Sequence, residues 1–337
     1  MDHPFPIGKL PPAFLNSILA NAPQFDRRVL LGPGIGLDCA VVDMGDRYWV
    51  FKADPITFAT DQIGWYAVQV ASNDIATTGA TPRFMLLTLL LPEGKSDEAL
   101  VRSISDQVFS ACNQHQITVL GGHTEVTHGI DRPLLVITLI GEVLKDRLVT
   151  PRGARPGDAL LLTKGIPIEA TSLLAREFPD RLAQHLTSLE IRQAADFLYH
   201  PGIGVFRDAQ IALQAGKVTA MHDPTEGGLS AALWEMAQAC GQDILFDPSA
   251  VTIPSLAARI CLIFGLDPFA TIASGALLLA VQPSDAEPIL NTLRENDIAA
   301  SRIGEIVAGD GKVFTLTGTR RILWPYPDRD EIGKVFD

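Results

Sequence analysis

The strongest interruption in the sequence lies near its middle, at residues 149–158. This segment reads VTPRGARPGD and places two prolines and two glycines between two apolar runs that are typical of strands. Prolines and glycines clustered in this way interrupt regular structure, so the segment predicts a linker. A chain of 337 residues is long enough for two domains of ordinary size. We therefore predict one domain over residues 1–150 and a second over residues 151–337.

Both halves mix strand-like and helix-like segments. In the first half, the apolar patterns predict strands at 40–43, 48–53, 84–91, 117–120 and 134–143, and helices at 63–79 and 96–114. In the second half they predict strands at 159–163, 219–221, 276–281 and 302–306, and helices at 168–177, 204–216, 228–240 and 285–296. Ser96 and Ser284 are the predicted N-caps of two of these helices. Strict strand–helix alternation is missing, so the pattern favours an α+β fold in each half.

Charge and composition restrict the partners. The chain carries 39 acidic against 27 basic residues, a net charge of −12, and phosphate backbones are bound by basic surfaces. The most apolar runs, 84–91 and 134–140, are too short to span a bilayer. The first residues lack the pattern of a secretory signal, and the four cysteines form no C-x-x-C pair. We expect a cytoplasmic protein that binds neither nucleic acid nor membranes.

Three aspartates of the first half stand where a ligand-binding carboxylate is expected. Asp38 follows the glycine-containing turn at 32–37, Asp54 ends the predicted strand 48–53 before Pro55, and Asp74 interrupts a helix of small and apolar residues. A buried ionised carboxylate needs a partner, and hard cations such as Mg²⁺ take oxygen ligands and bridge phosphates. Each aspartate alone is more often a turn former or a cap. Together they favour a magnesium–nucleotide site.

A pair of glycines adds to this group. Gly121 and Gly122 follow an apolar strand and precede His123, Thr124 and Glu125, whose side chains can bond phosphate, metal or ribose. Glycine at this place predicts a turn at which the backbone approaches a ligand closely.

The segment MHDPTEGGL at 221–229 joins a predicted strand to a predicted helix in the second half. Backbone amides at a helix N-terminus bind anions, so the segment is a candidate substrate or phosphate loop. Ordinary helix capping explains it equally well. The candidate residues of this loop are Asp223, Thr225, Glu226, Gly227 and Gly228. Nucleophile-elbow, P-loop and kinase signatures are absent from the sequence, so no catalytic residue is assigned.

The order of these motifs resembles the aminoimidazole ribonucleotide (AIR) synthase-related, or PurM-like, superfamily. The resemblance is carried by DCAV at 38–41, by Asp54, by NDIATTGATP at 73–82 and by GGHT at 121–124. Residues 155–158 and 221–229 are most similar to the branch of the hydrogenase maturation protein HypE. The resemblance implies a two-domain α+β fold, with an N-terminal domain that dimerises through its sheet and ATP bound between the domains.

The resemblance also implies the chemistry. ATP and Mg²⁺ are the implied cofactors, and an oxygen of a small-molecule or protein-borne acceptor would attack a phosphorus atom of ATP. The implied ATP-binding residues are Lys9, Asp38, Asp54, Asn73, Asp74, Gly121, Gly122 and Thr124. The implied metal ligands are Asp38, Asp54, Asp74 and Glu125. The acceptor is not specified by the sequence.

Three departures from the family pattern bear on the reaction. His123 stands where a carboxylate is frequent, the segment before Leu10 has one glycine where HypE has several, and no cysteine follows Cys261. HypE carries its substrate on a C-terminal cysteine, so the HypE route to cyanide is not expected, and a missing early cysteine disfavours selenophosphate synthetase. Two alternatives stay open: a small-molecule kinase that resembles thiamine-monophosphate kinase, and a nucleotide-binding scaffold without chemistry.

Overall fold

The computed structural model describes residues 5, 10–34, 36–56 and 61–336, so Lys9 lies outside the described residues. The chain divides into two compact units. The first unit comprises residues 26–32 and 38–148, and the second unit comprises residues 1–25, 33–37 and 149–337. Each unit contains its own sheet and its own helices, which confirms the predicted α+β class.

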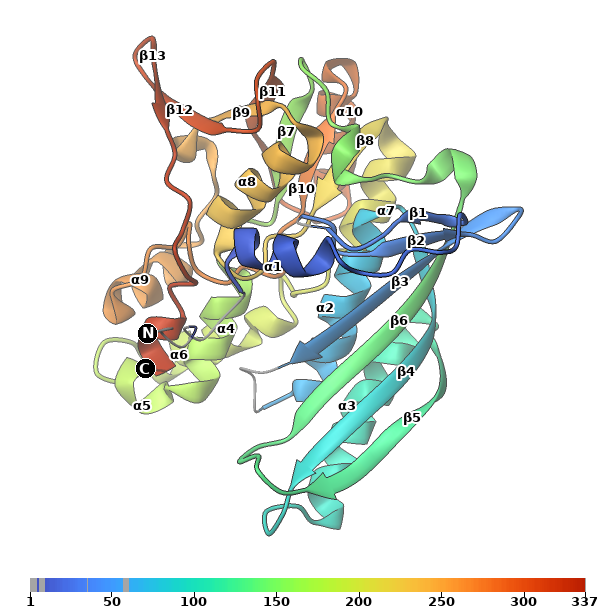
Figure 1. Ribbon diagram of the computed structural model, residues 1–337. Helices are drawn as coiled ribbons and strands as arrows, with labels where there is room; N and C mark the ends of the chain where they lie inside the picture. Colours follow the sequence, from blue (N-terminus) through green and yellow to red (C-terminus); the bar gives the residue numbers. More distant parts are fainter. Residues whose placement is uncertain (1–4, 6–9, 35, 57–60, 337) are drawn as a thin grey trace, which may run out of the picture. The chain divides into compact units, whose positions relative to one another are not determined.

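The first unit contains a six-stranded sheet in the order β1-β2-β3-β6-β4-β5. Its strands are β1 (Val29–Leu31), β2 (Ala40–Asp43), β3 (Arg47–Ile56), β4 (Thr81–Pro92), β5 (Thr118–Thr127) and β6 (Leu134–Leu144). The β4–β5 pair is parallel and the other pairs are antiparallel. Helices α2 (Ile63–Thr77) and α3 (Glu98–His115) lie on one face of the sheet (Figure 1).

The period of two in β6 separates the two faces of this sheet. Leu135, Ile137 and Leu139 are fully buried, whereas Val136 and Ile140 are half-buried. Alternate side chains of a strand point to opposite faces, so the first set faces the helices and the second set faces outward. We call these two sides the helix face and the outward face.

Three predicted boundaries were wrong. Strand β3 continues through Asp54 and Pro55 to Ile56, because β2 pairs with β3 only as far as Phe51 and leaves a free edge where proline needs no N–H partner. The glycines at 121 and 122 continue β5 instead of forming a turn. Helix α3 is capped by Asp97, whose carboxylate accepts the Leu100 N–H at 2.8 Å, and not by Ser96.

The second unit contains a seven-stranded sheet in the order β13-β12-β9-β11-β7-β10-β8. Its strands are β7 (Ala159–Thr163), β8 (Val218–His222), β9 (Asp243–Phe246), β10 (Leu278–Val281), β11 (Ala300–Val307), β12 (Val313–Thr317) and β13 (Arg320–Leu323). Its helices are α1 (Pro12–Leu19), α4 (Ile168–Glu177), α5 (Pro179–Leu182), α6 (Ser188–Ala195), α7 (Phe206–Ala215), α8 (Gly228–Cys240), α9 (Ser255–Phe264), α10 (Pro283–Glu295) and α11 (Gly333–Phe336).

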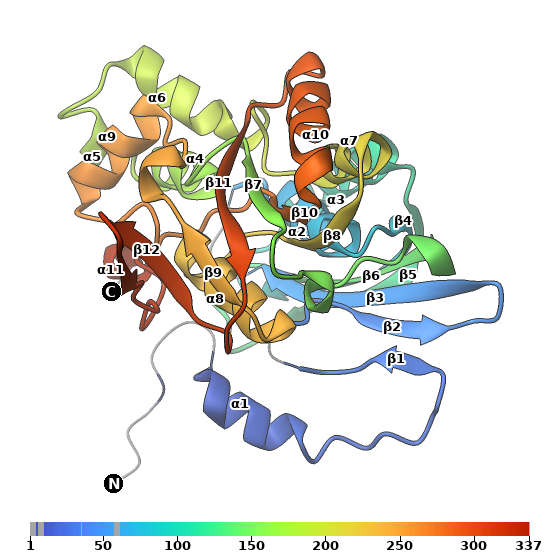
Figure 2. The same ribbon diagram turned by 90° about the horizontal axis from the view of Figure 1, so that it is seen from above.

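Helices pack on both faces of the second sheet. Leu233 and Met236 of α8 belong to one buried cluster with Leu160 and Leu162 of β7. Leu161 lies between those two strand residues and faces the opposite side, where α10 contacts β7 and β11 and lies beside α7 (Figure 2). The predicted N-cap at Ser284 was wrong, because α10 already begins at Pro283, a residue suited to the first helical position. Among the described residues, no helix is long and apolar enough to cross a membrane.

Candidate active site

A lysine in the first unit lies among the three predicted aspartates. The Lys52 Nζ atom is 3.0 Å from Asp74 Oδ2 and 3.4 Å from Asp54 Oδ1. Asp38 also interacts electrostatically with both Lys52 and Asp74. The structure therefore brings Asp38, Asp54 and Asp74 together around one ammonium group, which we call the aspartate cluster. Sequence analysis missed Lys52, although alternation along β3 places residues 52 and 54 on the same face.

Strand β3 and helix α2 position Lys52, Asp54 and Asp74 of the aspartate cluster, and Asp38 precedes β2. Lys52 and Asp54 project from the helix face of β3, which α2 covers, and Asp74 lies in the buried part of α2. The Asp74 carbonyl accepts hydrogen bonds from the Thr77 hydroxyl at 2.7 Å and from the Cys39 thiol at 3.3 Å. Asn73 is fully buried beside Asp74.

The electrostatics of the aspartate cluster are dominated by negative charge. Burial alone would lower the pKa of the Lys52 ammonium, but Asp74, Asp54 and Asp38 outweigh burial and raise this pKa. Burial raises the pKa of the Asp74 carboxyl, and Asp38 and Asp54 raise it further against the opposing effect of Lys52. With all groups ionised, three carboxylates against one ammonium leave two negative charges. An oxygen-rich group with this excess charge fits a divalent cation such as Mg²⁺.

The other predicted ligands of the first unit lie elsewhere. Three neighbouring strand pairs separate Gly122 from Asp54. Gly122 of β5 pairs with Leu87 of β4, Leu87 pairs with Ile137 of β6, and Ile137 pairs with Asp54 of β3. Gly122 is thus three strand spacings from Asp54, roughly 14 Å.

The pairing of β5 with β4 also shows from which face of the sheet residues 123–125 project. His123 and Glu125 project from the outward face, opposite to Asp54, and His123 Nε2 is 3.0 Å from Glu125 Oε2. Thr124 projects from the helix face. The structure does not bring Gly121, Gly122, Thr124 or Glu125 to the aspartate cluster within one chain.

Gly122 has a packing role in β5. A Cβ atom at this position would lie 1.8 Å from the Leu87 carbonyl oxygen. We expect Gly122→Ala to destabilise the protein by about 2 kcal/mol, because β5 would have to move away from β4. Urea unfolding measures the loss. Gly121→Ala is the control, since its Cβ would meet no atom within 4 Å. An equal loss in both variants would contradict the packing role.

In the second unit, the loop before α8 is capped by the protein itself. The Gly227 N–H donates to Asp330 Oδ2 at 2.6 Å, the Gly228 N–H to the Thr225 carbonyl at 2.9 Å, and the Ser230 N–H to the Phe269 carbonyl at 2.9 Å. A carboxylate from the C-terminal segment thus takes the position that sequence analysis offered to a phosphate. Asp223 is buried at the start of this loop, and Thr225 and Glu226 are half-buried.

Next to Asp223, His222 makes a short contact with a carboxylate of α8. The His222 Nε2 atom is 2.7 Å from Glu235 Oε2.

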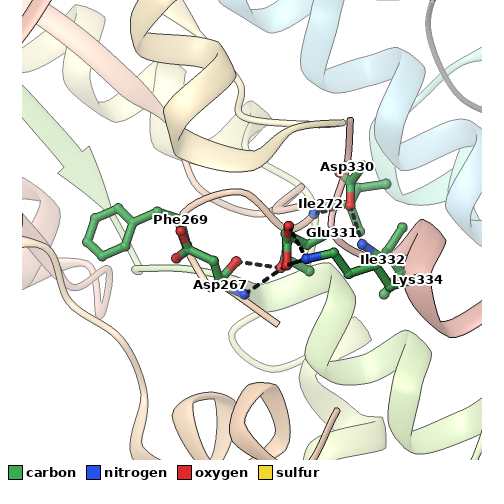
Figure 3. Close-up of polar contacts among 8 residues, drawn as sticks. Asp267, Phe269, Ile272, Asp330, Glu331, Ile332 and Lys334 are labelled. Atoms are coloured by element: carbon green, nitrogen blue, oxygen red, sulfur yellow. Dashed lines mark hydrogen bonds and ion pairs between the residues drawn. The ribbon is translucent and has the colours of Figure 1, made fainter. Parts of the chain in front are cut away.

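The segment that supplies Asp330 is held at several points. Asp330 Oδ1 accepts the Ile332 N–H at 2.7 Å and the Ile272 N–H at 3.2 Å (Figure 3). The Glu331 N–H donates to the Ala270 carbonyl at 3.0 Å, and Ile332 is fully buried. We call residues 328–336 the C-terminal strap. Sequence analysis did not find Asp330, because it meets Gly227 across 103 positions and no local pattern marks such a contact.

The family models match both halves of the chain. Residues 36–143 match the N-terminal domain of AIR synthase-related protein, and residues 155–317 match its C-terminal domain. The chain belongs to the AIR synthase-related protein family. The predicted resemblance is thereby confirmed. Asp38, Asp54 and Asp74 lie in the matched N-terminal domain of this family member, the loop at 223–228 lies in the matched C-terminal domain, and Asp330 lies beyond it.

Among its relatives is a putative hydrogenase expression/formation protein of Methanocaldococcus jannaschii, 30% identical over 317 residues, which cover 88% of each chain. The carbamoyl dehydratase HypE of Cupriavidus necator is 27% identical over 79% of this AIR synthase-related chain and 73% of its own length.

Solved structures agree with the family. A crystal structure of hydrogenase maturation protein HypE in complex with ATP superimposes with a TM-score of 0.69 at 25% identity, covering 92% of this chain and 90% of that one. Thiamine monophosphate kinase of Aquifex aeolicus superimposes with a TM-score of 0.67 at 17% identity, covering 85% and 92%, and shares the fold of this AIR synthase-related protein.

Proposed function

We propose that this protein is a magnesium- and ATP-dependent enzyme that phosphorylates or activates an oxygen atom of an acceptor. The observation that carries the proposal is the aspartate cluster, in which Asp38, Asp54 and Asp74 surround Lys52. Membership of the AIR synthase-related family and the ATP complex of a HypE structure support ATP as the co-substrate. We further propose that the domain predicted over residues 1–150 binds the nucleotide through the first unit, residues 26–32 and 38–148, and that residues 151–337 form the acceptor domain.

The residues of the cluster have separate roles in this proposal. The three aspartates would hold Mg²⁺, which neutralises phosphate charge when it is bound. Lys52 limits repulsion among the carboxylates and keeps Asp54 and Asp74 in position. In the reaction, an acceptor oxygen forms a bond to phosphorus as the bond to the leaving phosphate oxygen of ATP breaks.

Binding of a non-hydrolysable ATP analogue tests the proposal. We expect the wild type to bind it only with Mg²⁺, and Asp54→Asn and Asp74→Asn each to weaken binding at least tenfold, because changing even an outer-shell partner of a metal typically costs tenfold or more. Calorimetric titration measures both. Asp43→Asn is the matched control, because Asp43 pairs with Lys145 on the same sheet, away from the cluster.

The outcomes separate the alternatives. Magnesium-dependent binding that survives in both variants would overturn the assignment of the aspartate cluster. Binding lost in both variants, followed by acceptor-dependent release of ADP in the wild type, would support an enzyme. Binding without ADP release for any acceptor would favour a nucleotide-binding scaffold.

We also propose that the protein forms a homodimer through the outward face of the first sheet. This face carries Trp49, Phe84, Leu86 and Ile140, and Leu86 is 42% exposed. A contiguous apolar surface of this kind is typical of an interface. We expect Leu86→Glu to convert a dimer to a monomer in analytical ultracentrifugation. Leu262→Glu, at an exposed position of α9, is expected to leave the dimer intact, and a monomeric wild type would contradict the proposal.

A further inference from the structure

A buried glutamate of the second unit has an oxygen without a partner. Glu169 lies in the first turn of α4 and is only 7% exposed. Its carboxyl group accepts hydrogen bonds from the hydroxyl and the backbone N–H of Ser274. Its Oε2 atom is buried and has no hydrogen-bond partner among the described residues. A buried polar atom left in this state costs free energy, so its presence needs an explanation.

Two more carboxyl groups lie around Glu169. Asp330 of the C-terminal strap and Glu226 of the loop before α8 both interact electrostatically with it, and both disfavour its ionisation. Within the described part of the chain, no lysine, arginine or histidine forms an ion pair with Glu169 or Asp330. Burial and these neighbours raise the pKa of Glu169 to about 7 and that of Asp330 to about 6. Glu169 and Asp330 therefore carry negative charge that no ion pair of the described residues balances, and a positive ligand would relieve it.

We infer that Glu169, with Asp330, binds a positively charged nitrogen group of the acceptor, a primary ammonium or an amidinium. This inference rests on the proposed function, because it names the chemical class of the acceptor. Such a group supplies both a positive charge for the carboxyls of Glu169 and Asp330 and an N–H donor for Glu169 Oε2.

The C-terminal strap borders this site. Asp330 links the strap to Gly227 and Ile272, which belong to the two loops beside Glu169 and Ser274. The end of the strap packs through Phe336 against Phe178, with ring centroids 5.4 Å apart. Because Glu169 is only 7% exposed, a ligand reaches it only if the strap or a loop beside it moves.

Titration with small cations tests the inference. The probes are acetamidinium and methylammonium, with neutral acetamide as the matched uncharged molecule, each titrated by calorimetry with and without the magnesium–ATP analogue. We expect both cations to bind the wild type and acetamide not to bind. Glu169→Gln is expected to weaken cation binding at least tenfold while the variant stays folded and still binds the ATP analogue. Glu331→Gln, in the same strap but paired with Lys334, is expected to bind the cations normally.

Each outcome decides the matter. Cation binding by Glu169→Gln that equals the wild type, or no cation binding by the wild type under either condition, would overturn the inference. If the cations do not bind but the ATP analogue does, the inference fails and the proposed function stands. If the ATP analogue does not bind the wild type, the proposed function fails, and cation binding then reports only on the acidic site.

Discussion

Replacing Lys52 with methionine is expected to destabilise the protein by about 3–5 kcal/mol in the absence of Mg²⁺, the cost typical of removing one partner of a buried ion pair. In the part of the chain that the structure describes, Lys52 is the cation that pairs with Asp74, and its Nζ atom is 3.0 Å from Asp74 Oδ2. Without it, Asp54 and Asp38 would still disfavour ionisation of Asp74, and the ammonium group that opposes them would be missing. Urea unfolding of the first unit, followed through the fluorescence of Trp49 and Trp65, measures this loss.

Added Mg²⁺ is expected to restore part of the stability of Lys52→Met, because a ligand that binds only the folded state stabilises it. The wild type should gain less from Mg²⁺, since its cluster already contains an ammonium group. Lys145→Met is the control: Lys145 pairs with Asp43 at an exposed position 2.6 Å away, and its loss should leave unfolding close to that of the wild type. Equal stability of Lys52→Met and wild type would refute the account of the cluster.

The aspartate cluster shows how much of a site a sequence can reveal. Asp38, Asp54 and Asp74 were predicted because a carboxylate near a glycine turn, at a strand end or inside an apolar helix is unusual by itself. Lys52 was missed because a lysine in a strand is ordinary. Its burial among carboxylates results from the packing of α2 on β3, which the sequence does not show. The end of strand β3 was predicted wrongly because of Pro55. Whether proline ends a strand depends on the neighbouring strand, which the sequence does not show.

Sequence patterns predicted a smaller part of the site in the second unit. The loop at 223–228 was found from its Asp-Pro turn and paired glycines, and it does lead into α8. Asp330 accepts the hydrogen bond from the Gly227 N–H of this loop and lies about a hundred residues later in the chain. It stands in a run of charged residues that is typical of a solvent-exposed end. Contacts between such distant segments depend on tertiary packing, so neither Asp330 nor its proximity to Glu169 follows from local patterns.

Replacing Glu169 with glutamine is expected to stabilise the protein, and the gain should grow with pH. The pKa of Glu169 is raised to about 7 in the folded state from 4.5. Between these values the folded state holds more protons than the unfolded state, so the wild type loses stability as pH rises through this window. Glutamine stays neutral, so the gain should rise from about 1 kcal/mol at about pH 5.5 to about 3 kcal/mol at about pH 8.

Urea unfolding at the two pH values, followed through Trp234 and Trp324, measures this gain in the second unit. Glu190→Gln is the matched control with the opposite sign. The Thr187 backbone N–H, Arg259 and the Thr187 hydroxyl lower the pKa of Glu190 to about 2, so its charge stabilises the folded state above the unfolded pKa of 4.5, and the variant should lose stability by a similar amount at both pH values. A pH-independent effect of Glu169→Gln would contradict a buried carboxyl without a counter-ion. We expect Glu169→Gln to be more stable than the wild type and to bind the cations more weakly. This combination is typical of a residue that serves binding, because replacing a residue that serves folding makes the protein less stable.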